Sequence, residues 1–177
     1  MKLGIVGCGM IVKDMLSFIH QIDSIKLQAI ASIPQEYNIV KELAKDNNIK
    51  KAYEKFEDIL IDDDVDTVYL GVPNSLHYAL TKQALESGKN VICEKPFTSN
   101  YDEAKELVEI AKEKKLLLFE AISTVYLPNT LKIKELLNEI GNVKIVVANY
   151  SQYSSRYDAF KKGEILPAFD YKNQAAH

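Results

Sequence analysis

The sequence predicts an α/β fold: a doubly wound parallel sheet of Rossmann type with strand order 3-2-1-4-5-6, followed by the beginning of an incomplete α+β domain. Three observations lead to this prediction. Short apolar runs alternate with segments of helical periodicity, as in parallel sheets covered on both faces. A glycine-containing turn, Gly7-Cys8-Gly9, joins the first apolar run to the first helical segment. The 177 residues are also enough to bury one α/β core with some chain left over.

Six apolar runs are predicted to be strands. Most of them are apolar at successive positions, which is typical of strands that are buried on both faces. We expect the strands at residues 2–6, 26–31, 51–53, 67–70, 90–93 and 116–121.

Helical spacing of apolar residues predicts the segments between the strands. Pro34 is expected in the first turn of the second helix, and Gly88 is expected to end the fourth. Asn100 and Glu103 form a capping pair for the fifth. The expected helices are residues 10–22, one opened by Pro34, 56–61, one ending at Ser87, and one running through Lys114.

The acidic run Asp62–Asp66 precedes the fourth strand. Because no further ligand pattern follows it, we interpret the run as a solvated loop and predict no metal site.

The pattern changes after the sixth strand. Residues 129–140 predict one more amphipathic helix, ended by Gly141, and residues 143–153 alternate as a half-buried strand does. The remainder, from Ser154 to His177, is polar, aromatic and loop-like. We therefore expect residues 1–122 to form a dinucleotide-binding domain. Residues 123–177 would begin a truncated C-terminal domain for substrate binding or oligomerisation.

Composition and charge exclude several functions. The sequence is 47% hydrophobic with a net charge of −3, which suits a folded protein and gives no reason to expect a nucleic-acid partner. Cys8 and Cys93 form no CxxC pair, so a disulfide framework is not expected. The apolar stretch before Cys8 is too short for a signal peptide, and no run is long enough to span a membrane. We expect a cytoplasmic protein.

The turn Gly7-Cys8-Gly9 predicts a phosphate-binding site. The first glycine permits the tight turn, and the second lets the backbone approach a pyrophosphate. The helix that begins near Met10 supplies unpaired N–H groups and the positive end of its dipole. Val12 replaces the third glycine of the usual fingerprint and should hold the helix slightly further from the strand.

The choice between NAD and NADP stays open. An acid at the end of the second strand would bind ribose hydroxyls, and an arginine would favour a 2′-phosphate. The sequence has Ser32-Ile33 there, and Ser32 suits either group. Glu36 is the nearest acid and is expected on the following helix.

The run Glu94-Lys95-Pro96 follows the fifth strand, which borders the ligand crevice of a doubly wound sheet. A lysine there can bind a substrate hydroxyl and help to move its proton while hydride goes to a nicotinamide. Glu94 could orient that lysine.

The order and spacing of Gly7-Cys8-Gly9, Gly71-Val72-Pro73-Asn74 with His77, Glu94-Lys95-Pro96 and Glu120-Ala121 resemble those of a known family. The sequence resembles the glucose–fructose oxidoreductase and inositol dehydrogenase (Gfo/Idh/MocA) family, particularly its dihydrodiol-dehydrogenase-like members. The resemblance extends from Lys2 to about Asp170. It implies an NAD(P)-dependent oxidoreductase that transfers hydride between a nicotinamide cofactor and a sugar- or polyol-like alcohol.

The same resemblance implies a role for each motif. Lys95 would be the catalytic residue that serves the substrate, and Glu94 would lie near the nicotinamide. Glu120 would close the pocket, and His77 would contact the cofactor. The pyrophosphate would lie on Gly7, Cys8, Gly9, Met10 and Ile11, the adenosine ribose beside Ser32 and Ile33, and the ribose and nicotinamide along Gly71, Val72, Pro73 and Asn74.

The second domain is the main departure from the family. In family members it is an open antiparallel sheet that covers the nicotinamide and carries a catalytic histidine. His177 is no replacement, because Asn173–Ala176 lacks the family's glycine-rich approach to that histidine. A truncated, non-catalytic dinucleotide-binding module is therefore the alternative function. An exposed strand edge at 143–153 further predicts self-association, or else disorder after about Tyr153. The partners would be a small alcohol or sugar and a second copy of the chain.

Overall fold

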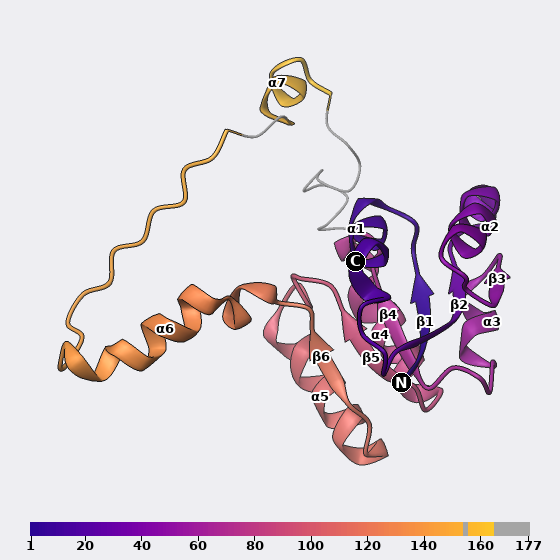
Figure 1. Ribbon diagram of the computed structural model, residues 1–177, viewed down its shortest axis with the longest axis horizontal. Coiled ribbons are helices and arrows are strands. Elements are labelled where there is room, and N and C mark those ends of the chain that lie inside the picture. The colour runs from indigo at the N-terminus through magenta and orange to yellow at the C-terminus, as the bar shows by residue number, and fades with distance from the viewer. Residues whose placement is uncertain (154–155, 165–177) are drawn as a thin grey trace. The chain divides into compact units, whose positions relative to one another are not determined.

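The computed structural model describes residues 1–153 and 156–164. The chain divides into two units, the first comprising Met1–Ala121 and the second beginning at Ile122 (Figure 1).

The first unit is built on a six-stranded sheet whose five strand pairs are all parallel. The strand order is β3-β2-β1-β4-β5-β6, which confirms the predicted doubly wound topology. The sixth strand begins at Leu118, two residues later than expected. The strands are β1 (Lys2–Val6), β2 (Lys26–Ala31), β3 (Lys51–Tyr53), β4 (Thr67–Leu70), β5 (Asn90–Cys93) and β6 (Leu118–Glu120).

Five α-helices and two 3₁₀ turns connect these strands. Pro34 opens the turn η1 rather than the second α-helix, which starts only at Tyr37. Asn100 caps the fifth helix as expected, because its Oδ1 accepts from the N–H of Glu103 at 3.0 Å. The elements are α1 (Met10–Ile19), η1 (Pro34–Glu36), α2 (Tyr37–Asp46), α3 (Phe56–Leu60), η2 (Asn74–Leu76), α4 (His77–Glu86) and α5 (Tyr101–Lys114).

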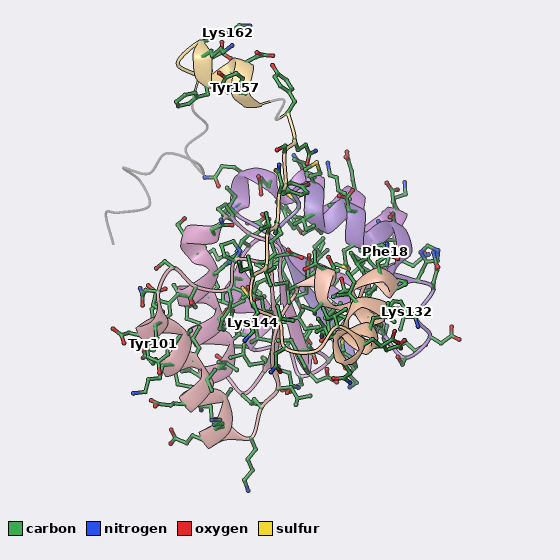
Figure 2. The ribbon with its side chains drawn as sticks, turned by 90° about the vertical axis from the view of Figure 1, so that its left-hand side faces the viewer. Phe18, Tyr101, Lys132, Lys144, Tyr157 and Lys162 are labelled. Carbon is green, nitrogen blue, oxygen red and sulfur yellow. The ribbon has the colours of Figure 1, made fainter. Side chains whose placement is uncertain are left out.

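The helices cover the sheet on both faces and bury one apolar core on each. The core that includes Phe56, Leu85 and Leu107 brings together α3, α4 and α5. The opposite core includes Val12 and Val40 and brings together α1 and α2. Neighbouring residues of one strand belong to different cores, which explains why the strands are apolar at successive positions. Phe18 on α1 and Tyr101 on α5, by contrast, are exposed (Figure 2).

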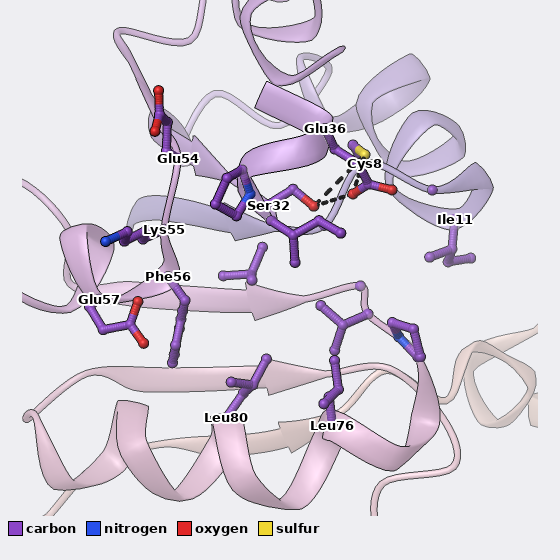
Figure 3. A pocket seen from close by; sticks show the side chains of 18 residues that line it. Cys8, Ile11, Ser32, Glu36, Glu54, Lys55, Phe56, Glu57, Leu76 and Leu80 are labelled. Atoms are coloured by element: carbon purple, nitrogen blue, oxygen red, sulfur yellow. Dashed lines mark hydrogen bonds between the residues drawn. The ribbon is translucent and has the colours of Figure 1, made fainter. Parts of the chain in front are cut away.

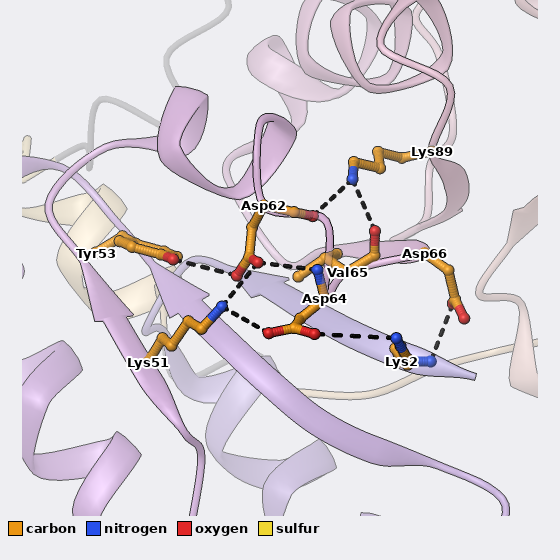
Figure 4. Close-up of polar contacts among 8 residues, drawn as sticks. All are labelled: Lys2, Lys51, Tyr53, Asp62, Asp64, Val65, Asp66 and Lys89. Atoms are coloured by element: carbon orange, nitrogen blue, oxygen red, sulfur yellow. Dashed lines mark hydrogen bonds and ion pairs between the residues drawn. The ribbon is translucent and has the colours of Figure 1, made fainter.

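The acidic run before β4 is exposed at Asp63, Asp64 and Asp66, as the predicted solvated loop requires, but it differs from that prediction at Asp62. The Asp62 side chain is only 5% exposed. It accepts from the Lys51 ammonium at 2.8 Å, the Tyr53 hydroxyl at 3.1 Å and the backbone N–H of Asp64 at 3.0 Å (Figure 4). The buried Lys89 ammonium donates to the carbonyl oxygens of Asp62 and Val65. The run is therefore a polar cluster that fixes the entrance to β4, at the amino edge of the sheet.

The second unit holds two α-helices in its described part. These are α6 (Pro128–Leu136), followed by the turn η4 (Leu137–Glu139), and α7 (Arg156–Lys161). The predicted helix over 129–140 is thus present, whereas α7 lies in a segment that was expected to be loop. His177 lies outside the described residues.

The prediction of a strand over residues 143–153 is wrong, because those residues pair with no other strand in the described part of the chain. A strand requires a hydrogen-bonded neighbour, and alternating side chains alone do not supply one. Ile145, Val146 and Val147 remain 80–90% exposed. Among the described residues, no helix combines the length and the apolar character needed to cross a membrane.

Candidate functional site

The residues that follow four of the strands are aligned along the carboxyl edge of the sheet. Each donates its backbone N–H to the last residue of a neighbouring strand: Gly7 to Ala31, Gly71 to Val6, Glu94 to Leu70 and Ala121 to Cys93. The strand order reverses direction between β1 and β4, and ligands of open α/β sheets bind outside the carboxyl ends at such a point. The glycine turn and the Glu-Lys-Pro turn therefore lie on the same edge of the sheet.

Gly7 and Gly71 approach each other too closely for any side chain at position 7. Gly7 has a φ of +106°, and a Cβ placed there would lie 2.3 Å from the carbonyl oxygen of Gly71. The first glycine of the predicted turn is thus required by the protein's own backbone.

Gly9 differs, because a Cβ placed there would meet no protein atom within 4 Å. Gly9 is the N-cap of α1, and neither a capping side chain nor an acidic residue occupies the first turn of that helix. The space beside Gly9 is therefore free of protein atoms, and no capping or acidic side chain of the first turn serves the N–H groups at the start of α1, the arrangement that binds a phosphate.

A cavity of about 600 Å³ lies in front of this turn (Figure 3). Its size is within the range of small-molecule and cofactor sites. Among the residues predicted to bind cofactor, those that line it are Gly7, Cys8, Gly9, Ile11, Ser32, Ile33, Gly71, Val72 and Pro73. Met10, Asn74, His77, Glu94, Lys95 and Glu120 are not part of its lining.

Glu36 also lines the cavity, although the sequence prediction placed it on the helix and gave it no role. Its Oε2 accepts from the Ser32 hydroxyl at 2.5 Å and from the Cys8 thiol at 3.1 Å. These two hydrogen bonds lower the pKa of the Glu36 carboxyl. Burial, followed by the bond to Glu36, raises the pKa of the Cys8 thiol. Pro34 could have indicated this arrangement, since a turn that starts there brings residues 32 and 36 together.

The Glu94 carboxylate supports the turn that carries Lys95. Its Oε1 accepts from the Tyr69 hydroxyl at 2.9 Å, and its Oε2 accepts from the backbone N–H of Lys95 at 3.3 Å. Burial and the bond to Glu94 raise the pKa of Tyr69, which therefore stays a donor. Glu94 thus holds the backbone at Lys95 rather than its ammonium, and the Lys95 side chain is exposed.

His77 and Glu120 contact the backbone of the same turn. His77 is 1% exposed, with Nδ1 2.7 Å from the carbonyl oxygen of Pro96 and Nε2 3.1 Å from that of Val72. Glu120 accepts from the backbone N–H of Phe97 at 3.0 Å, directly after the cis Lys95–Pro96 peptide. Both side chains contact backbone atoms of the two residues that follow Lys95. Across residues 1–153 and 156–164, no three His, Cys, Asp or Glu side chains gather where they could hold a metal ion.

Comparison with curated proteins gives relatives that are oxidoreductases. The chain is 37% identical over 168 residues to scyllo-inositol 2-dehydrogenase (NADP(+)) of Bacillus subtilis, covering 95% of this chain and 51% of that protein. It is 30% identical over 151 residues to trans-1,2-dihydrobenzene-1,2-diol dehydrogenase of Xenopus tropicalis, covering 84% of this chain and 46% of that protein. The chain thus spans about half the length of the curated relatives that it matches.

A solved structure supports the same relationship. The 3-ketoreductase KijD10 of Actinomadura kijaniata, crystallised with NADP and TDP-benzene, matches with a TM-score of 0.74 at 29% identity, over 78% of this chain and 42% of that chain. The model of the oxidoreductase family with an NAD-binding Rossmann fold matches residues 1–122. The glycine turn, the strand order and these matches agree, and the chain belongs to the Gfo/Idh/MocA oxidoreductase family with an NAD-binding Rossmann fold.

Proposed function

We propose that the first unit binds NAD or NADP along the carboxyl edge of its sheet. The protein would use this cofactor to transfer hydride to or from a sugar- or polyol-like alcohol. The observation that carries the proposal is the open space at Gly9, in front of the uncapped end of α1 and beside the cavity. The alcohol class is supported by the relatives named as inositol and dihydrodiol dehydrogenases.

Each part of the edge would hold one part of the cofactor. The pyrophosphate would bind at residues 7–11 and the adenosine ribose beside Ser32 and Ile33. The segment 71–74 would contact the second ribose and the nicotinamide, with Glu94 nearby. Glu120 would close this end of the site. With both ring nitrogens against carbonyl oxygens, His77 would shape the site through the backbone instead of contacting the cofactor.

Lys95 is the proposed catalytic residue. Oxidation of an alcohol to a carbonyl releases a hydride and a proton, and the nicotinamide, when bound, accepts the hydride. The Lys95 amino group would hold the substrate hydroxyl by a hydrogen bond and help to move its proton. Its exposure leaves the side chain accessible to a substrate, while Glu94, His77 and Glu120 hold its backbone.

The test separates binding from catalysis. NADH and NADPH fluorescence titrations measure binding, and steady-state rates are measured with inositols, sugars and a dihydrodiol. We expect Lys95→Met to retain cofactor affinity and to lose turnover. Lys105→Met, on the exposed face of α5, is the matched control and should keep both. Binding without hydride transfer to any substrate would instead indicate the non-catalytic dinucleotide-binding module. Failure to bind either nucleotide would overturn the proposal.

We further propose a cytoplasmic homo-oligomer that binds a small alcohol or sugar and no nucleic acid. Cys8 and Cys93 are free, as a reducing compartment favours, and the net charge of −3 disfavours nucleic acid. The exposed apolar residues 145–147 favour association with a second copy. Light scattering over a range of concentrations tests this; a monomer throughout would contradict it.

A further inference from the structure

The carboxylate of Glu36 occupies the place where a Rossmann site reads the 2′ position of the adenosine ribose. That place is the end of the second strand, at Ser32. Glu36 follows four residues later, and the turn η1 brings its Oε2 to 2.5 Å from the Ser32 hydroxyl (Figure 3). A carboxylate therefore lies at the end of β2, although neither residue 32 nor residue 33 is acidic.

The hydrogen bonds determine what this site can offer to a ligand. The Ser32 hydroxyl and the Cys8 thiol both donate to Oε2 of Glu36, so their protons are directed to the carboxylate. Neither of these two bonds uses Oε1, which is left to accept from a ligand. Because both bonds also lower its pKa, Glu36 is an anion at neutral pH. The site therefore presents an acceptor for a hydroxyl, not donors for a phosphate.

Most of the charged side chains around this site are also negative. The cavity lining includes the carboxylates of Glu36, Glu54 and Glu57 and the single cation Lys55. Residues 1–121 contain no arginine, the side chain best suited to bind a phosphate in a bidentate manner. Where an arginine beside Ser32 would favour a 2′-phosphate, the sequence has Ile33, which is 55% exposed.

We propose that Glu36 makes this protein selective for NAD over NADP, by accepting from the 2′-hydroxyl of the adenosine ribose and repelling a 2′-phosphate. The inference rests on the proposed dinucleotide binding. It sets this chain apart from the B. subtilis relative, which is named as an NADP(+) enzyme.

The test compares binary dissociation constants of NADH and NADPH, so no substrate is needed. We expect the unmodified chain to bind NADH at least about tenfold more tightly than NADPH, since the 2′-phosphate would meet the Glu36 carboxylate. Glu36→Gln should reduce this ratio about tenfold or more, mainly by improving NADPH binding. Adding Ile33→Arg to that variant should reverse the preference.

Glu42→Gln is the matched control, because Glu42 is exposed on α2 and does not line the cavity. It removes the same charge and should leave the ratio unchanged. Equal or tighter binding of NADPH by the unmodified chain would overturn the inference, as would an unchanged ratio in Glu36→Gln. Failure of both nucleotides to bind would instead overturn the proposed function itself, so the two failures are distinguishable.

Discussion

Val12 and Gly71 are complementary in size where α1 packs against the end of β4. A Cβ placed on Gly71 would lie only 2.6 Å from Cγ2 of Val12, which is fully buried on α1. Position 12 holds the third glycine in the usual fingerprint, where its role is close packing of helix and strand. Here the larger residue is on the helix, and Gly71, directly after β4, leaves the space that it fills. The missing fingerprint glycine is thus compensated by a glycine directly after the neighbouring strand.

The contact between positions 12 and 71 predicts that substitutions at these two positions have coupled effects on the free energy of unfolding. Gly71→Ala should lower the free energy of unfolding by about 1–3 kcal/mol, because the new methyl group overlaps Val12 Cγ2 and approaches Tyr69 Cε1 at 3.0 Å. In a Val12→Ala background the same substitution should cost about 1 kcal/mol less, as expected of residues in contact. Urea unfolding of the four proteins measures this coupling. Strictly additive effects would show that the two residues do not share this space.

The two glycines of the turn should respond differently to alanine. Gly7→Ala combines a positive φ with the overlap on the Gly71 carbonyl and should cost about 2 kcal/mol or more. Gly9 has a φ of −71° and no protein atom near its Cβ position, so Gly9→Ala should change stability by less than about 1 kcal/mol.

Gly9→Ala should nevertheless weaken dinucleotide binding about tenfold or more, because its methyl group enters the space left for the pyrophosphate. Thermal unfolding and nucleotide titration of each variant separate the two effects. An unchanged affinity in Gly9→Ala would place the pyrophosphate elsewhere.

The fold of the first unit could be predicted because its signals are local. Most strands between residues 2 and 93 are apolar at successive positions, and Gly88 ends α4 as predicted, with a φ of +80°. Right-handed crossovers then leave few possible strand orders. The prediction of a strand at 143–153 was wrong because strand pairing is not a local property. Alternating apolar and polar residues specify the two faces of a strand, but the partner strand must come from another part of the chain.

The parts of the candidate site that the backbone forms could be predicted from the sequence. The parts that side chains form were harder to predict. Gly7 and Gly9 were predicted from their position between the first strand and the first helix, and Gly71 was predicted from the family resemblance. The positions of the carboxylates depend on contacts between distant or turn-connected residues, and those contacts cannot be read from spacing. Glu94 binds Tyr69 rather than the Lys95 ammonium, and Glu36 reaches back to Ser32.

Asp62 should contribute to stability in a pH-dependent way. Its burial alone would raise the carboxyl pKa, but hydrogen bonds from Lys51, the Asp64 N–H and Tyr53 outweigh this effect and lower the pKa below its usual 3.8. A depressed folded-state pKa stabilises the protein above the unfolded-state pKa, and this stabilisation is lost as pH falls through the folded-state value.

Asp62→Asn should therefore cost about 1–2 kcal/mol at pH 7, and this difference from the unmodified protein should shrink below about pH 4. Asp63→Asn is the matched control, since Asp63 is exposed in the same run. Urea unfolding between pH 3 and pH 7 makes the measurement. A difference that stayed constant down to pH 3 would show that the Asp62 charge is not what stabilises the loop.

His77 should stabilise the Lys95 turn through the backbone. His77→Phe keeps an aromatic ring in the buried site but removes the ring N–H, which a carbonyl oxygen of Pro96 or Val72 accepts depending on the tautomer. We expect a loss of about 1–3 kcal/mol in unfolding free energy, because buried polar groups without partners are costly. We also expect faster amide exchange at Phe97, whose N–H is bound to Glu120 in the same turn.

His20→Phe, at the exposed end of α1, is the control and should change neither quantity. Unchanged exchange at Phe97 in His77→Phe would mean that Glu120 and Glu94 hold the turn without the histidine, and would remove His77 from the residues that position Lys95.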